Sequence, residues 1–332
     1  MQKNGEEGNM ITFSKKFWGI ILLCCTFLLA ACNDKSATNN EQKNTGKDNN
    51  KKITVVTTIA QIGEPLSVIG GDRVEVKSLM GPSVDPHLYQ ATHGDIQTLE
   101  NADVVFYNGL HLEANMVDIF EEIEKSKPVL AIGETIDKSK LLHDENNAVD
   151  PHIWFDIDLW QQALDAAVDQ LKEYSPENTS YFEENKVKYF EKLQQLKEDA
   201  KKLTEIPEEQ RILVTAHDAF GYFGRMHHMK VVGLQGLSTD GEIGISDIQN
   251  TIDTIVKYKV PAVFVESSIN ESSIKAVIEG AKKQGVPIQL GGELFSDAMG
   301  KAGTEEGTYL GMYRHNIDTI YTALKGGSNT NE

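Results

Sequence analysis

The chain has 332 residues, of which 40% are hydrophobic and 25% charged, and its formal net charge at pH 7 is −18. This length and apolar content are sufficient for two packed domains. The acidity argues against a nucleic-acid-binding or anionic-lipid-binding surface, since both ligands favour Lys and Arg, and it is compatible with a cationic ligand.

The first predicted element is an export signal. Two lysines precede an apolar run over residues 17–31, which is shorter than the about 20 residues that a membrane-spanning helix requires. The run ends in "LAAC", the pattern of a lipoprotein cleavage site. Residues 1–31 are therefore predicted to be a lipoprotein signal peptide, starting at Met1 or Met10, and Cys32 to carry the lipid. A transmembrane anchor is the alternative.

Lipid on Cys32 would hold the protein at the extracytoplasmic face of the cell membrane. All three cysteines lie within the first 32 residues, so the mature chain cannot form an internal disulfide and its stability must come from a packed core. Residues 32–52 hold no large apolar residue and are predicted to be the lipidated cysteine followed by a disordered tether.

From residue 53 onward, short β-branched runs alternate with longer amphipathic ones, as in parallel strands joined by crossover helices. We predict an α/β fold with two lobes, residues 53–174 and 207–328, each a mostly parallel four-stranded sheet with flanking helices. The predicted strands are 53–58, 74–79, 104–107, 128–132, 212–215, 231–234, 262–265 and 288–290. The predicted helices of the lobes are 61–69, 93–101, 116–125, 246–258, 272–284 and 309–324.

Residues 175–206 are predicted to connect the lobes. Ser175 suits a helix N-cap and Pro176 the first helical position, and apolar residues then recur at helical spacing. One long helix over 175–204 is expected. Such a stiff connector would restrict large hinge closure between the lobes.

Four side chains with metal-binding chemistry follow predicted strands. His87 stands in the phrase "DPH", which returns at His152 in "DPHIWFD"; His217 and Asp297 follow strands of the second lobe. Open α/β sheets bind their ligands at the carboxyl ends of strands, so these loops could converge on one cleft. Imidazole and carboxylate without thiolate suit Mn²⁺, Zn²⁺ or Fe²⁺.

Each of these residues also has a structural interpretation. A single Pro-His in a loop is often a surface or capping residue, His217 could cap the helix after it, and Asp297 could be an N-cap. Their equivalent positions on the two predicted lobes favour the metal site. Glu266, at the end of a strand, is predicted to accept a hydrogen bond from a ligand imidazole and so to select its tautomer.

An enzyme of the zinc hydrolase class is an alternative function for the same ligands. The sequence contains no H-E-x-x-H, Walker A, G-x-G-x-x-G or G-x-S-x-G motif, so we predict that the protein is not an enzyme. A surface adhesin is compatible with a lipoprotein, although the chain carries no motif for that role.

The mature chain resembles the metal-binding lipoproteins of ABC importers, the TroA-like cluster, and most of all its manganese-binding members. The likeness runs through "LMGPSVDPHLYQAT", "NADVVFYNGLHLE", "VTAHDAFGYFGR", "GLQGLSTDGEIG" and "GGELFSDAMG". The resemblance implies two α/β lobes joined by a backbone helix, with one divalent cation between them held by His87, His152, His217 and Asp297. It also implies an ABC permease and its ATPase as partners. We expect a monomer.

The identity of the metal is left open by the ligands. In some manganese-binding relatives a glutamate replaces the third histidine, whereas His217 stands here, and three-histidine sets occur in both zinc and manganese members. Zinc-specific relatives often carry a long loop rich in His, Asp and Glu, whereas residues 137–150 contain a single histidine, His143. Mn²⁺ is favoured, with a zinc-specific binding protein as the alternative, although Zn²⁺ binds more tightly to most such sites in vitro.

Overall fold

Residues 51–326 are described by a computed structural model, so the predicted signal peptide, Cys32 and nearly all of the tether lie outside the described residues. The described residues belong to one compact unit. No helix among them is both long and apolar enough to cross a bilayer.

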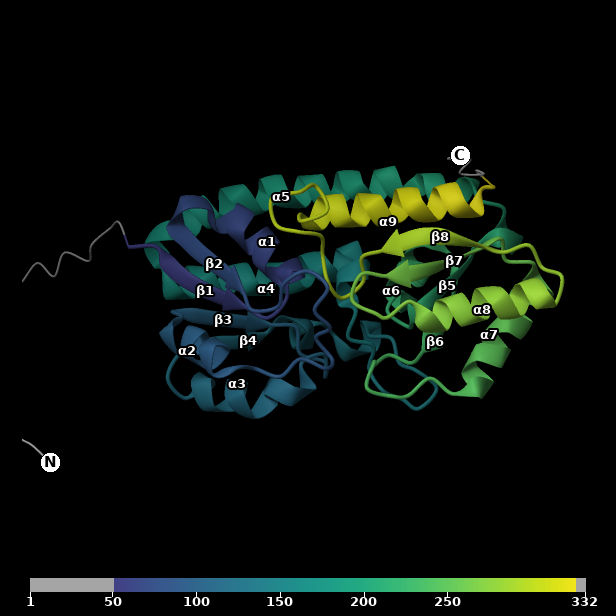
Figure 1. Cartoon of the computed structure of the whole chain (residues 1–332). Helices are drawn as coiled ribbons and strands as arrows, with labels where there is room; N and C mark the ends of the chain where they lie inside the picture. The colour runs from purple at the N-terminus through teal and green to yellow at the C-terminus, as the bar shows by residue number, and fades with distance from the viewer. Residues whose placement is uncertain (1–50, 327–332) are drawn as a thin grey trace, which may run out of the picture. The chain divides into compact units, whose positions relative to one another are not determined.

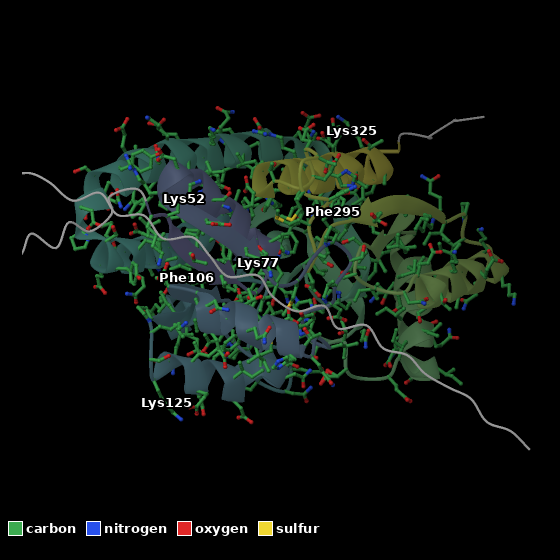
Figure 2. The ribbon with its side chains drawn as sticks, turned by 60° about the vertical axis from the view of Figure 1, so that its left-hand side comes forward. Lys52, Lys77, Phe106, Lys125, Phe295 and Lys325 are labelled. Atoms are coloured by element: carbon green, nitrogen blue, oxygen red, sulfur yellow. The ribbon has the colours of Figure 1, made fainter. Side chains whose placement is uncertain are left out.

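A parallel sheet with the strand order β2-β1-β3-β4 forms the first lobe (Figure 1). Its strands are β1 (Ile53–Thr57), β2 (Val74–Ser78), β3 (Val104–Tyr107) and β4 (Val129–Ala131). The central strands β1 and β3 are almost entirely buried, as expected for a parallel sheet covered on both faces. On the edge strand β2, buried Val74 alternates with exposed residues such as Lys77. Figure 2 labels Lys77 together with Phe106 of β3, which is fully buried.

Five α-helices accompany this sheet, and four of them lie where the sequence predicts helix. They are α1 (Ala60–Gly70), α2 (His93–Asn101), α3 (Val117–Glu124), α4 (Ile157–Tyr174) and α5 (Thr179–Ala200). Helix α4 was not predicted. Its signals are Asp156, whose side chain caps the first turn, and buried residues at helical spacing such as Leu164, Val168 and Leu171.

The helix predicted over 175–204 is shorter as an α-helix than expected. Helix α5 is flanked by 3₁₀ turns at Pro176–Asn178 and Lys201–Glu205. Ser175 does not cap the α-helix, because Pro176 opens the tighter turn and the N–H of Asn178 bonds to the Ser175 carbonyl at 3.0 Å. The last helix of the chain, α9 (Tyr309–Leu324), lies alongside α5 and also contacts α1 (Figure 1).

The second lobe contains four parallel strands in two hydrogen-bonded pairs, β5 with β6 and β7 with β8. They are β5 (Ile212–His217), β6 (Lys230–Gln235), β7 (Ala262–Glu266) and β8 (Gln289–Leu294). The prediction of one continuous sheet is therefore wrong in this detail. Strands β5 and β7 lie next to each other without a ladder between them. A side chain replaces the backbone contact there, because Glu266 Oε1 accepts a hydrogen bond from the N–H of His217 at 2.9 Å.

The two faces of β5 belong to two hydrophobic cores. Ile212 and Val214 pack into the core under α7 (Ile245–Tyr258) and α8 (Ser272–Lys283), whereas Leu213 between them faces a larger core shared with the first lobe. This alternation follows from the two-residue period of a strand. The short helix α6 (Gly221–His227), which was not predicted, adds aromatic residues to the shared core. Both lobes are thus joined by buried apolar side chains.

Candidate metal centre

The structure brings together the four residues in which the sequence predicts metal-binding chemistry. His87 lies in the loop after β2, and Asp297 in the loop after β8. His217 is the last residue of β5 rather than a loop residue, and His152 follows β4 only after twenty intervening residues. One ligand atom from each residue lies within 4.8 Å of the other three.

The three imidazoles present their Nε2 atoms to the Asp297 carboxylate. His152 Nε2 lies 3.3 Å from Oδ1, and His217 Nε2 and His87 Nε2 lie 3.2 and 3.6 Å from Oδ2. The Nε2 atoms of His87 and His152 are 3.4 Å apart. All four side chains are buried, and His87 retains the largest exposed fraction, 6%.

Several of these atoms have no hydrogen-bond partner among the described residues. They include Nε2 of His217 and both carboxylate oxygens of Asp297, although all three are buried. A buried polar atom without a partner reduces the stability of the folded protein, so a ligand at this point is expected. Three nitrogens and two oxygens that converge on one point suit a divalent transition-metal cation. The residues present therefore fit the predicted cargo. This arrangement also excludes Asp297 as a helix cap.

Glu266 lies where it can orient His217. Its Oε2 is 2.6 Å from Nδ1 of the ring, so Nε2 is the nitrogen left to face Asp297. His217 does not cap the following helix, since α6 begins at Gly221.

Asp150 makes the corresponding contact with His152, a role that was not predicted from the sequence. Its Oδ1 accepts a hydrogen bond from the backbone N–H of His152 at 2.9 Å and lies 2.8 Å from Nδ1 of the ring. Asp85 accepts from the N–H of His87 in the same way, also at 2.9 Å. The repeated "DPH" phrase is thus a repeated turn, in which the aspartate bonds to the histidine N–H two residues on and the proline restricts the backbone between them. That repetition was the available signal for Asp150.

Charge is balanced within the centre between carboxylates and imidazoles. Burial alone would raise the pKa of the Asp297 carboxyl, but His217 and His152 hold it well below its usual value. Burial opposes a charge on His152, yet Asp150 and Asp297 raise its pKa to about 9. Burial also opposes a charge on His217, whose pKa Glu266 and Asp297 raise well above its usual value. His87 differs, because burial lowers its pKa to about 4.

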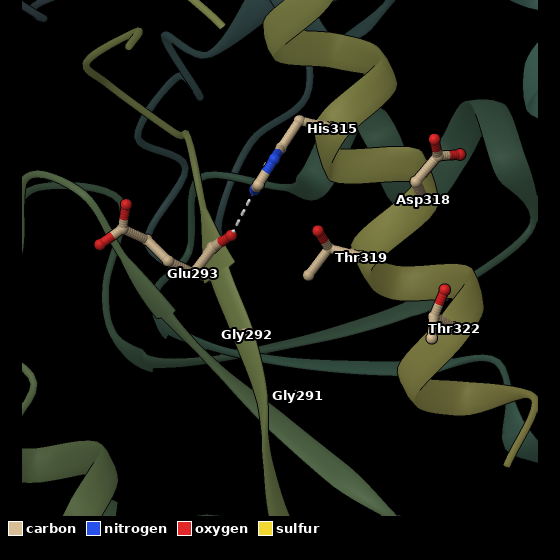
Figure 3. A pocket seen from close by; sticks show the side chains of 7 residues that line it. All are labelled: Gly291, Gly292, Glu293, His315, Asp318, Thr319 and Thr322. Atoms are coloured by element: carbon tan, nitrogen blue, oxygen red, sulfur yellow. Dashed lines mark hydrogen bonds between the residues drawn. The ribbon is translucent and has the colours of Figure 1, made fainter. Parts of the chain in front are cut away.

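His315 belongs to a different place. Figure 3 shows a pocket between β8 and α9 that none of the four clustered side chains lines, where Nε2 of His315 lies 2.9 Å from the Glu293 carbonyl oxygen. Glycines on the strand allow α9 to lie close to β8: a Cβ at Gly292 would lie 2.7 Å from Thr319 Cγ2. His315 is therefore not part of the cluster formed by the four candidate ligands.

The chain matches a family of known proteins over most of its length. The family described as "Zinc-uptake complex component A periplasmic" (ZnuA) matches residues 55–323. The manganese-binding lipoprotein MntA of Bacillus subtilis (strain 168) is 49% identical over 278 residues, which are 83% of this chain and 91% of that protein. The zinc-binding protein TroA of Treponema pallidum (strain Nichols) is 47% identical over 276 residues, 82% of this chain and 89% of that protein.

Two further comparisons extend the likeness. The metal ABC transporter substrate-binding lipoprotein SsaB of Streptococcus sanguinis is 30% identical over 283 residues, 83% of this chain and 90% of that protein. The solved structure of the periplasmic zinc-binding protein TroA from Treponema pallidum superposes with a TM-score of 0.81 at 46% identity. It covers 82% of this chain and 99% of that one. The α/β fold with two lobes is therefore confirmed.

Proposed function

Because the chain belongs to the ZnuA family of metal-binding substrate-binding proteins, as its sequence resemblance predicted, we propose that it captures a divalent transition-metal cation for an ABC importer. One observation carries this proposal: three imidazole nitrogens and a carboxylate, all buried, lie within 4.8 Å of one another. His87, His152, His217 and Asp297 are the proposed ligands. A stable site built from both lobes suits capture and delivery, in which binding rather than chemistry is the function.

We favour Mn²⁺ as the cargo. The relative at 49% identity is named a manganese-binding lipoprotein, and the donor set combines nitrogen and oxygen without sulfur. The relative TroA at 47% identity is named a zinc-binding protein, which makes Zn²⁺ the alternative cargo. The carboxylates of Asp150 and Glu266 add negative charge behind two of the imidazoles, and this favours any divalent cation.

The location follows from the predicted anchor. The relatives MntA and SsaB are named lipoproteins, which supports lipid attachment at Cys32 and a place on the extracytoplasmic face of the membrane. SsaB is also named an ABC transporter substrate-binding protein, which supports a permease and its ATPase as partners. We propose that the protein acts as a monomer, with its lobes at 53–174 and 207–328 and the connector at 175–206.

The enzyme and adhesin alternatives have less support. A zinc hydrolase needs an open coordination position and a general base near a bound water. Here the carboxylates closest to the imidazoles, Asp150 and Glu266, contact Nδ1 atoms instead of facing the centre. The relative SsaB is named a metal ABC transporter substrate-binding lipoprotein, and MntA a manganese-binding lipoprotein. Hydrolysis of ester or peptide substrates would favour the enzyme, and metal-independent binding to host matrix would favour the adhesin.

Calorimetry on single alanine variants of the four proposed ligands tests the site. Each variant should bind Mn²⁺ and Zn²⁺ at least tenfold more weakly than the wild type, a loss of about 1.4 kcal/mol. His315→Ala is the matched control, because this imidazole contacts the Glu293 carbonyl oxygen outside the cluster. A cluster variant that bound metal like the wild type would remove that residue from the ligand set.

Uptake by cells tests the cargo. Cells that lack this protein should accumulate less radiolabelled Mn²⁺, and a plasmid copy should restore uptake whereas a His152→Ala copy should not. A loss confined to Zn²⁺ would replace our choice of cargo with the zinc alternative.

A further inference from the structure

A second contact between the lobes lies beside the metal centre. Thr239 stands in the segment 236–244 that follows β6, and its hydroxyl donates a hydrogen bond to Asp85 Oδ2 at 2.6 Å. The other oxygen of Asp85 accepts from the backbone N–H of His87 at 2.9 Å. One carboxylate therefore ties a side chain of the second lobe to the turn that carries a proposed ligand of the first.

The segment 236–244 is itself held at the metal centre. Gln235, the last residue of β6, pairs in register with His217 of β5. Its amide nitrogen donates to the carbonyl oxygen of Thr239 at 2.7 Å and also to that of Gly241. A series of hydrogen bonds thus leads from the strand end at His217, through Gln235 and Thr239, to the turn at His87.

Asp85 and Asp150 make the same turn but differ in their second contact. Asp150 uses Oδ1 for both the N–H and the ring of His152, within the first lobe. Asp85 instead directs its second oxygen across to Thr239. The ring of His152 is therefore oriented from its own lobe, and the Tyr222 hydroxyl of the second lobe reaches that turn only at the Asp150 backbone carbonyl, at 3.1 Å. At the other turn the His87 carbonyl accepts from Asn115 Nδ2 of the first lobe at 3.2 Å, whereas the Asp85 carboxylate is bonded from the second lobe.

Two other hydrogen bonds between the lobes, both next to Asp297, are better protected from water. The Ser296 carbonyl, next to Asp297, accepts from Gln61 Nε2 at 3.1 Å and from Trp154 Nε1 at 3.2 Å, and both hydrogen bonds are buried. The Thr239–Asp85 bond is only partly buried. Water competes for a partly exposed hydrogen bond, so this contact breaks at lower cost than the buried pair.

We propose that Thr239 is a positioning residue of the second lobe that holds His87 in the metal centre. When the Thr239–Asp85 bond breaks, the turn at His87 is released first and the cation leaves on that side. This inference rests on the proposed function, since it takes the four clustered side chains as the metal site.

Three variants of the loop test the role of the Thr239 hydroxyl. Thr239→Val keeps the shape and removes the donor, and Thr239→Ser keeps the donor. Ser238→Ala is the matched control, because that hydroxyl bonds to Asp240 within the same loop. We expect Thr239→Val to raise the rate of Mn²⁺ dissociation, measured by chelator competition, about tenfold, while Thr239→Ser and Ser238→Ala stay near the wild-type rate.

Hydrogen exchange of the amides in 236–244, measured on the metal-free protein, gives an independent readout. Exchange there should be faster in Thr239→Val than in Thr239→Ser, with the thermal unfolding midpoint unchanged. The proposal would be overturned if Thr239→Val and the wild type had equal rates of Mn²⁺ dissociation and of amide exchange. It would also be overturned if Thr239→Ser lost metal as fast as Thr239→Val. Failure of the wild type to retain any metal would instead overturn the proposed function, and the exchange measurement would still decide the role of Thr239.

Discussion

Glu266 holds His217 by both oxygens of one carboxylate: Oε1 accepts from the backbone N–H at 2.9 Å, and Oε2 lies 2.6 Å from Nδ1 of the ring. The same side chain therefore joins β7 to β5 and orients a proposed ligand. The contact fits the role predicted for Glu266 from the sequence, and we retain that role as a proposal.

Replacement of Glu266 by Gln should weaken metal binding. The amide keeps the size of the side chain but removes the negative charge beside Nδ1, so the His217 imidazole becomes a poorer donor. We expect Mn²⁺ affinity, measured by calorimetry, to fall about tenfold. Glu293→Gln, an exposed carboxylate on the adjacent strand β8, should leave the affinity unchanged. An unaltered affinity in Glu266→Gln would show that the carboxylate serves the strand contact alone.

Metal binding should release protons over a wide pH range. Despite burial, carboxylates raise the pKa of His152 to about 9 and that of His217 well above its usual value, so both rings carry protons at neutral pH before metal binds. Burial lowers the pKa of His87 to about 4, so that ring contributes no proton at pH 6 or above. Metal requires neutral imidazoles, and its apparent affinity should therefore rise with pH through the neutral range, because binding displaces a proton from each of these two rings.

Calorimetry in buffers of different ionisation enthalpy counts these protons. We expect about two protons released per metal ion at pH 6, 7 and 8 alike. Histidines with ordinary pKa values, near 6.5, would release almost none at pH 8. A count that fell to zero between pH 6 and 8 would contradict the raised pKa values.

Gly133 should be intolerant of a side chain. A Cβ there would lie 2.6 Å from the carbonyl oxygen of Asn108, which already accepts from the N–H of Gly133 at 2.8 Å. The Asn108 side chain also donates to the Pro151 carbonyl, next to His152, at 3.0 Å. Gly133→Ala should reduce the free energy of unfolding by about 1–3 kcal/mol through overpacking. Urea unfolding measures this loss. Gly81→Ala, with no atom within 4 Å of the added methyl group, is the control and should change stability little.

The lipid anchor is tested through Cys32, which lies outside the described residues. Cys32→Ser should remove the acylation site, so the protein should appear in the medium or as an unprocessed precursor rather than in the membrane fraction. Cys25→Ser, inside the predicted signal peptide, should be lipidated and membrane-bound as in the wild type. Palmitate labelling together with fractionation measures both. A Cys32→Ser protein processed and anchored as before would contradict the lipoprotein assignment.

The sequence by itself determined most of the local structure and the identity of the candidate ligands. Hydrophobic periodicity placed every strand and most helices within a few residues of their bounds, because the period of apolar residues reports directly which face of an element is buried. Helices α2 and α9 and strand β3 begin and end at the predicted residues. The "DPH" turns were visible because an aspartate, a proline and a histidine in that order make a contact within three residues.

Only the tertiary structure decided which atoms meet. Three contacts depend on side-chain rotamers and on the packing of one lobe against the other. In these contacts the imidazoles present Nε2 to the centre, Asp150 orients His152, and Thr239 reaches Asp85. Thr239 and Asp85 are 154 positions apart in the chain, so no local pattern reports their contact. The missing ladder between β5 and β7 has the same origin, because the sequence pattern that predicts four strands is the same whether they form one sheet or two pairs. The pairs are joined by apolar packing between β5 and β7 and by a long-range hydrogen bond from the backbone of His217 to Glu266.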